Sequence, residues 1–161
     1  MISIRRSALP ARPDVFIILN PCWYPPLDKE PIYEATTRDI RIRVRPEYQD
    51  EQSTPDEGYY FWTYTVEIAN EGEETVQLKS RVWRITNALG KTEEVRGPGV
   101  VGQTPKIPPG QEFTYTSGCP LSTPSGIMVG SYQMVDEDGK LFDVAIPAFS
   151  LDSPFAVRSV N

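Results

Sequence analysis

The stretch Arg38–Tyr48, "RDIRIRVRPEY", decides the fold class, because apolar and charged side chains alternate along it. Its apolar face carries Ile40, Ile42 and Val44. Its opposite face carries Arg41, Arg43 and Arg45. A period of two is the pattern of a half-buried β-strand. We interpret the arginine face as a solvated surface and keep an anion-facing stripe as the alternative.

Similar patterns follow along the chain and indicate further strands. The segment Tyr59–Asn70, "YYFWTYTVEIAN", is rich in aromatic and β-branched residues and predicts a central strand. The segment Thr75–Gly90, "TVQLKSRVWRITNALG", predicts another strand. There we expect Val76, Leu78 and Val82 to face inward, with Trp83 and Ile85 opposite. Asp138 and Gly139 mark the turn of a later hairpin. No stretch has the pattern of a capped amphipathic helix, so we expect an all-β, two-sheet sandwich of about seven or more antiparallel strands.

The absence of histidine from all 161 residues limits the catalytic and metal-binding sites that the chain can form. It excludes Ser-His-Asp and Cys-His catalytic pairs and any metal site built on histidine. The net charge of −6 argues against general nucleic-acid binding, which needs a positive face. Cys22 and Cys119 lie far apart and form no C-x-x-C motif, so we expect two reduced thiols in a cytoplasmic protein.

Three regions are expected along the chain. Residues 1–32 contain several prolines and no periodicity, which indicates an irregular arm. The aromatics Trp23 and Tyr24 are candidates for docking that arm onto the domain. We expect the folded domain over residues 33–154 and a short tail over 155–161. The composition changes abruptly at Tyr33, which suggests that residues 1–31 are a start-site extension. No apolar run reaches the ~20 residues of a membrane span, so we expect no membrane partner.

The segment Glu94–Gln103, "EVRGPGVVGQ", holds a G-x-G-x-x-G motif at Gly97, Gly99 and Gly102. A dinucleotide site needs this motif to open a helix after a strand, and the neighbouring prolines prevent that. Two interpretations remain: the glycines only shape the backbone, or their free N–H groups bind an anion. For the second, the candidate contacts are the three glycines with Arg96 and Lys106, and Arg84 is an additional candidate. A third role is a protein contact through exposed Val100 and Val101.

The acidic loop Glu47–Glu57 offers carboxylates but no known cation-binding spacing. It would have to supply the ligands of any metal-dependent phosphohydrolase, which is the weakest of the function hypotheses. We therefore expect no enzyme, no protein-held metal and no cofactor. A divalent cation would enter only through a bound phosphate ligand.

Several segments resemble the ApaG family, also called the DUF525 domain. They include "YEATTRDIRIRVRPEY", "RGPGVVG", "PPGQEFTYTSG" and "GSYQMVDEDG". The resemblance covers roughly three quarters of the chain and implies a fibronectin type III-like, immunoglobulin-like β-sandwich. It also implies a poorly defined role in cobalt resistance and magnesium efflux, and no established catalytic residues. The glycine motif is discussed in this family as a pyrophosphate or nucleotide contact. Eukaryotic F-box and polymerase-delta-interacting proteins contain the domain as an interaction module.

This chain departs from the family pattern at one candidate position, because Lys106 stands where some members have histidine. The leading hypothesis is a non-enzymatic module that binds an unidentified protein partner through the loop Arg96–Lys106. The alternative is a pyrophosphate or nucleotide sensor that uses the glycine loop. A monomer and a homodimer both remain open, because edge strands of a sandwich can pair.

Overall fold

The computed structural model describes residues 3–4 and 31–156 of the chain. The described strands are β1 (Ser3–Ile4), β2 (Tyr33–Thr37), β3 (Ile40–Tyr48), β4 (Tyr60–Asn70), β5 (Val76–Asn87), β6 (Thr92–Pro98), β7 (Lys106–Ile107), β8 (Glu112–Leu121), β9 (Ser125–Val135) and β10 (Leu141–Asp152). Two short 3₁₀ turns, η3 (Asp50–Gln52) and η4 (Pro55–Glu57), lie between β3 and β4. The described residues contain no helix that is both long and apolar enough to span a membrane.

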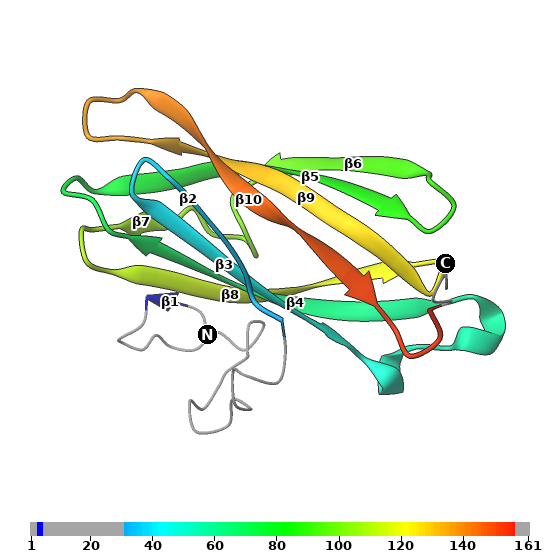
Figure 1. Ribbon diagram of the computed structural model, residues 1–161. Coiled ribbons are helices and arrows are strands. Elements are labelled where there is room, and N and C mark those ends of the chain that lie inside the picture. Colours follow the sequence, from blue (N-terminus) through cyan, green and yellow to red (C-terminus); the bar gives the residue numbers. More distant parts are fainter. Residues whose placement is uncertain (1–2, 5–30, 157–161) are drawn as a thin grey trace, which may run out of the picture.

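The strands form two antiparallel sheets that pack face to face (Figure 1). One sheet has the order β1-β8-β4-β3-β2, and the other has the order β10-β9-β5-β6, with β7 also paired to β5. Strand β10 packs against β2 and β3 of the opposite sheet. The expected all-β sandwich with at least seven strands is confirmed.

Strands β3 and β4 supply much of the core, as their alternation predicts. Ile40, Ile42 and Val44 of β3 are all buried. In β4 the alternating residues Trp62, Tyr64, Val66 and Ile68 are buried, as are Ala69 and Asn70 at the end of the strand. Strand β4 lies between β3 and β8, so its prediction as a central strand is confirmed. The hairpin of β9 and β10 also turns where expected, with Gly139 at φ +80° and Asp136 N–H donating to the Lys140 carbonyl.

Strand β5 corrects the expected orientation of its second half. Leu78 pairs with Met134 of β9 and Ser80 pairs with Gln133, so one extra residue, Lys79, is inserted on the β5 side. Such a bulge reverses the alternation that follows it. As a result Trp83 is buried in the core at 3% exposure, and Val82 is only half-buried. The prediction that Val82 faces inward and Trp83 outward is therefore wrong.

The arginine face of β3 is a set of ion pairs with acids of neighbouring segments. Arg41 Nη1 lies 2.8 Å from Glu71 Oε2, and Arg43 Nε lies 3.7 Å from Glu34 Oε1. Both arginines also lie within 4 Å of Glu67 Oε1. Because carboxylates already neutralise these two guanidiniums, the surface interpretation is favoured over an anion-facing stripe.

Some expectations fall outside the described residues. These are the docking of Trp23 and Tyr24, the state of Cys22, most of the arm over residues 1–32 and the end of the tail over 155–161. The other cysteine, Cys119, is a buried free thiol. Burial raises its pKa to about 11, so the thiol is protonated at neutral pH.

Candidate functional site

The glycine motif lies where the chain leaves the free edge of the second sheet. Strand β6 runs along β5 as far as Pro98, and the chain returns to β5 with β7. Between them, Val100 and Gln103 exchange two backbone hydrogen bonds of 2.8 Å around Val101 and Gly102. Val101 has φ +40° and Gly102 has φ +78°. This is the geometry of a two-residue type I′ hairpin turn.

Each glycine of the motif has a structural reason. Gly99 has φ +59°, and a Cβ there would lie 2.3 Å from the Gln103 carbonyl oxygen. A Cβ on Gly97 would lie 3.0 Å from Nη1 of Arg81, so this glycine lets the guanidinium rest against the backbone. Gly102 occupies the second central position of the turn, where positive φ is required. The three glycines therefore allow this segment to fold tightly against β5.

This geometry corrects two premises about the loop. Val100 is 1% exposed and belongs to the core, so it offers no exposed apolar surface, and Val101 is half-buried against that core. The N–H groups of Gly99, Val100 and Gln103 donate to backbone carbonyls within the protein. They are not free for an anion, because the turn and the contact with Lys79 use them.

The predicted basic contacts lie on the surface. Arg96 is 68% exposed and pairs with Glu94 at 3.0 Å. Lys106 and Arg84 are also exposed. The fold does not gather these side chains around the glycines. Neither of the two cavities described below is lined by Arg84, Arg96 or Lys106.

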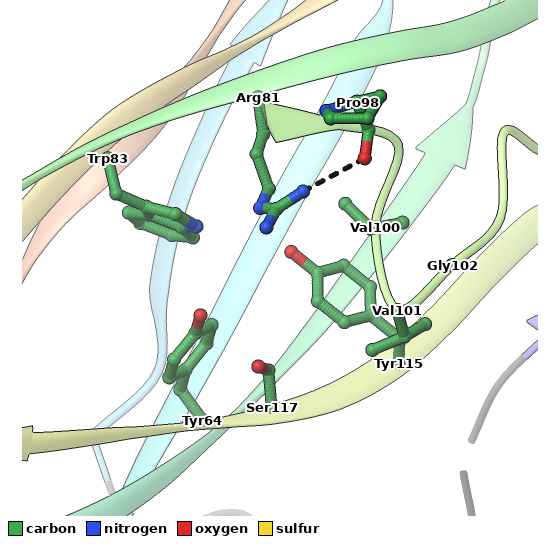
Figure 2. A pocket seen from close by; sticks show the side chains of 9 residues that line it. All are labelled: Tyr64, Arg81, Trp83, Pro98, Val100, Val101, Gly102, Tyr115 and Ser117. Carbon is green, nitrogen blue, oxygen red and sulfur yellow. Dashed lines mark hydrogen bonds between the residues drawn. The ribbon is translucent and has the colours of Figure 1, made fainter. Parts of the chain in front are cut away.

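Arg81 is the basic residue that the fold places beside the motif. The bulge at Lys79 turns Arg81 toward the interior, on the same face as Trp83. Its Nη1 donates to the Pro98 carbonyl at 3.0 Å (Figure 2). The same nitrogen donates to the Gly99 carbonyl at 2.8 Å, and the two hydrogen bonds fix the guanidinium. Within the described part of the chain no carboxylate pairs with it.

Sequence reasoning missed Arg81 because it continued the alternation of β5 without interruption. The sequence does contain a signal for the change. Leu78 and Trp83 are both large and apolar, yet they are five positions apart, an odd step that puts them on opposite faces of a regular strand. Placing both in the core requires one inserted residue between them, and Arg81 then shares the inward face.

Two adjoining cavities open between the sheets on this side of the sandwich. The smaller, of about 260 Å³, is lined by Tyr64, Arg81, Trp83, Pro98, Val100, Val101, Gly102, Tyr115 and Ser117. The larger, of about 560 Å³, shares Tyr64, Arg81, Trp83 and Ser117 with it. The larger cavity continues between β6 and β8, past Val95 and Cys119. Volumes of this order are typical of small-molecule sites.

Polar groups converge on the smaller cavity. Figure 2 shows the Arg81 guanidinium, the Trp83 indole nitrogen and the hydroxyls of Tyr64, Tyr115 and Ser117 around one space. Burial raises the pKa of Tyr64 to about 12. Burial also raises the pKa of Tyr115 well above its usual range, and the Tyr115 hydroxyl is hydrogen-bonded to that of Tyr132. Both phenols are neutral at physiological pH, so Arg81 supplies the formal charge of this cavity.

A group of acidic residues lies near the hairpin of β9 and β10 and lines neither cavity. Among the described residues, one group of three acids has ligand oxygens within 4.8 Å of one another: Glu74, Asp136 and Asp138. Asp136 serves the hairpin turn, because its Oδ1 accepts the N–H groups of Asp138 and Lys140. These hydrogen bonds lower its pKa. The loop Glu47–Glu57 contributes nothing to this group, so the structure gives the phosphohydrolase hypothesis no support.

Comparison with known proteins identifies close relatives over most of the chain. Protein ApaG of Beijerinckia indica is 58% identical over 130 residues, which are 81% of this chain and 100% of that protein. Protein ApaG of Methylocella silvestris matches with the same identity and coverage. A solved structure of a protein described as ApaA from Bordetella pertussis has a TM-score of 0.70 and 45% identity. It covers 77% of this chain and 98% of that one.

The match to the family model is consistent with these relatives. The model described as the ApaG domain, DUF525, matches residues 50–136, which lie inside the expected domain range of 33–154. The matched segment contains β4 to β9, the glycine motif and Arg81. The chain belongs to the ApaG family.

Proposed function

We propose that this protein is a non-enzymatic binding module that holds the phosphate or pyrophosphate group of a small molecule in front of Arg81. The observation that carries the proposal is the lining of the smaller cavity. It combines a guanidinium, an indole N–H and three hydroxyls, with no carboxylate among its residues. Such a set of donors around one cation suits an oxyanion.

The glycine motif takes part in this function through Arg81. Gly97 leaves room for the guanidinium, and Gly99 and Pro98 supply the carbonyls that hold Nη1. The remaining Arg81 nitrogens have no partner within the described residues and lie at the cavity. Pre-positioning a guanidinium lowers the entropy that ligand binding costs. Arg96 and Lys106, exposed on the outside, contribute at most long-range attraction.

The family resemblance implies a role in cobalt and magnesium homeostasis. That role is compatible with this proposal if the cation binds to the ligand rather than to the protein. Mg²⁺ and Co²⁺ bind phosphate oxygens, so a cation would arrive as part of a metal–phosphate complex. No cluster of protein ligands is then required.

The test is amide chemical-shift titration of the labelled chain with pyrophosphate and ATP, each with and without Mg²⁺. We expect saturable shifts at Arg81, Val101 and Gly102, and weaker binding at high salt. Arg81→Gln should weaken binding about tenfold or more, because it removes a charge-assisted contact. Arg96→Gln is the matched control and should change affinity by less than about twofold. Equal losses in both variants, or no shifts at millimolar ligand, would contradict the proposal.

A protein partner is the second candidate function, and strand β6 favours it. This strand is the free edge of its sheet, and six of its seven residues are exposed. Val95 on β6 is 40% exposed, and Tyr59, which lines the same larger cavity, is 43% exposed. Exposed edges accept an added strand. Glu94→Pro should then abolish binding of a purified partner while leaving phosphate binding intact, because the Glu94 N–H points away from β5 and this residue lines neither cavity. If the partner still binds this variant, the edge of β6 is not the docking site.

A further inference from the structure

We infer that the ligand is an organic phosphate with two distinct ends: its phosphate lies in the smaller cavity, and an apolar body lies in the larger one. The inference rests on the proposed function and specifies the class of ligand.

The buried donor at the phosphate end is the first support. The Trp83 side chain is 3% exposed, and its Nε1–H has no hydrogen-bond partner. This nitrogen points toward the space that Arg81 and the hydroxyls surround (Figure 2). A buried indole N–H without a partner is costly and usually finds one. A phosphate oxygen between Trp83 and Arg81 would satisfy it together with the free nitrogens of the guanidinium.

The continuity of the two cavities is the second support. Trp83 and Arg81 line both, so a group bound by them is at the border of the larger space. Inorganic phosphate would fill only the polar end. The remaining volume between β6 and β8 is available to whatever is attached to the phosphate.

The chemistry of the larger cavity is the third support. Its apolar lining comprises Ile85, Val95, Cys119, Leu121 and Met128, besides the aromatic residues. Met128 and Cys119 are buried at 1% and 4% exposure, and burial keeps the Cys119 thiol protonated. A ring or short alkyl chain placed here loses contact with water, which favours binding in proportion to its apolar area.

The charges at this end argue against a second anionic group. Glu93 lines the larger cavity and acts on Cys119 electrostatically, in the direction that raises the thiol pKa. A negative group at the far end of the ligand would meet this carboxylate, and besides Arg81 only the exposed Lys91 among the lining residues would offset it. The favoured ligand therefore has its negative charge at one end.

The experiment compares phenyl phosphate with inorganic phosphate by isothermal titration calorimetry on the full chain. Phenyl phosphate should bind at least about tenfold more tightly, because its ring enters the apolar cavity. Arg81→Gln should abolish saturable binding of both. Val95→Asn should weaken phenyl phosphate about threefold and leave inorganic phosphate unchanged.

Ile127→Asn is the matched control for Val95→Asn. Ile127 is a similarly exposed aliphatic residue, at 51%, and it lines neither cavity. This control should bind both anions like the unmodified chain, and thermal melts of every variant check folding.

The outcomes separate this inference from the proposed function. Equal affinities for both anions, each lost in Arg81→Gln, would overturn the two-ended ligand and leave the phosphate site standing. Tighter binding of phenyl phosphate that survives Arg81→Gln would also overturn the inference, because the ring would bind without its phosphate in the smaller cavity. Failure of both anions to bind at millimolar concentration would overturn the inference and the proposed function together.

Discussion

The two sides of the sandwich close in different ways. On one side β10 covers β2 and β3, and the Phe149 ring lies 6.1 Å from Tyr33 and 5.9 Å from Trp83. Arg38 adds an ion pair to Asp136 and stacks 4.1 Å from the Phe142 ring centroid. On the other side cavities separate β6 from β8. The closed side is filled by packed rings, whereas the open side leaves a cavity beside the unpartnered Trp83 Nε1–H, and that difference supports placing the proposed site there.

The turn around Val101 and Gly102 belongs structurally to the core despite its position at the open side. Val100→Asp should destabilise the domain by more than about 4 kcal/mol, because it buries an unpaired carboxylate. Urea unfolding measures this loss. Leu89→Asp, at a residue 84% exposed, is the control and should cost little. A folded Val100→Asp chain that only loses a protein partner would restore the role of this loop as an exposed contact.

The closed side should carry most of the packing energy. Phe149→Ala removes a buried ring from contacts with Tyr33, Tyr64 and Trp83, and should cost about 3–5 kcal/mol. Val95→Ala at the open side should cost less than about 1 kcal/mol, since that side chain is 40% exposed. Chemical denaturation compares the two variants. Similar losses would show that the open side is as tightly packed as the closed one.

Alkaline pH should act through the phenols at the polar cavity. The folded-state pKa of Tyr64 is about 12, above its ordinary value of 10.0, so folding favours the protonated phenol. The resulting stability is present below pH 10 and is lost as the pH rises to about 12. For Tyr64 this loss is on the order of 2 kcal/mol. Tyr64→Phe should flatten the decline in unfolding free energy, while Tyr59→Phe, at an exposed tyrosine, should not. Equal slopes would remove Tyr64 as a cause.

The smallest expected change in stability concerns Gly97. An added Cβ would press on the Arg81 guanidinium at 3.0 Å, and the end of this side chain can shift by a few tenths of an ångström. Gly97→Ala should therefore cost less than about 1 kcal/mol in stability. Phosphate affinity should nevertheless fall severalfold, because the guanidinium loses its fixed position. Calorimetry and denaturation on the same variant separate the two effects. Unchanged affinity would show that the position of Arg81 is not critical.

The sequence predicts the regular parts of this fold well because strand periodicity is local. Strands β3 and β4 and the hairpin of β9 and β10 follow directly from alternation and turn residues. Strand β5 does not, because the amino-acid composition does not reveal the inserted residue Lys79. That residue reverses which side chains face inward in the rest of the strand. For the same reason Arg81 was absent from the predicted contacts. The glycine spacing was visible, but which atoms approach those glycines depends on the pairing of β5 with β6.

The bulge at Lys79 also bears on which changes in chain length this site tolerates. Lys79 is the extra residue at the point where Leu78 pairs with Met134 and Ser80 pairs with Gln133. Its deletion would therefore restore a regular strand and leave Arg81 and Trp83 on the inward face. One residue inserted between Arg81 and Trp83 would instead place these two side chains on opposite faces. The indole would then lose its place beside Phe149. In this sandwich the proposed site depends on the spacing of Arg81 and Trp83 rather than on the length of the strand.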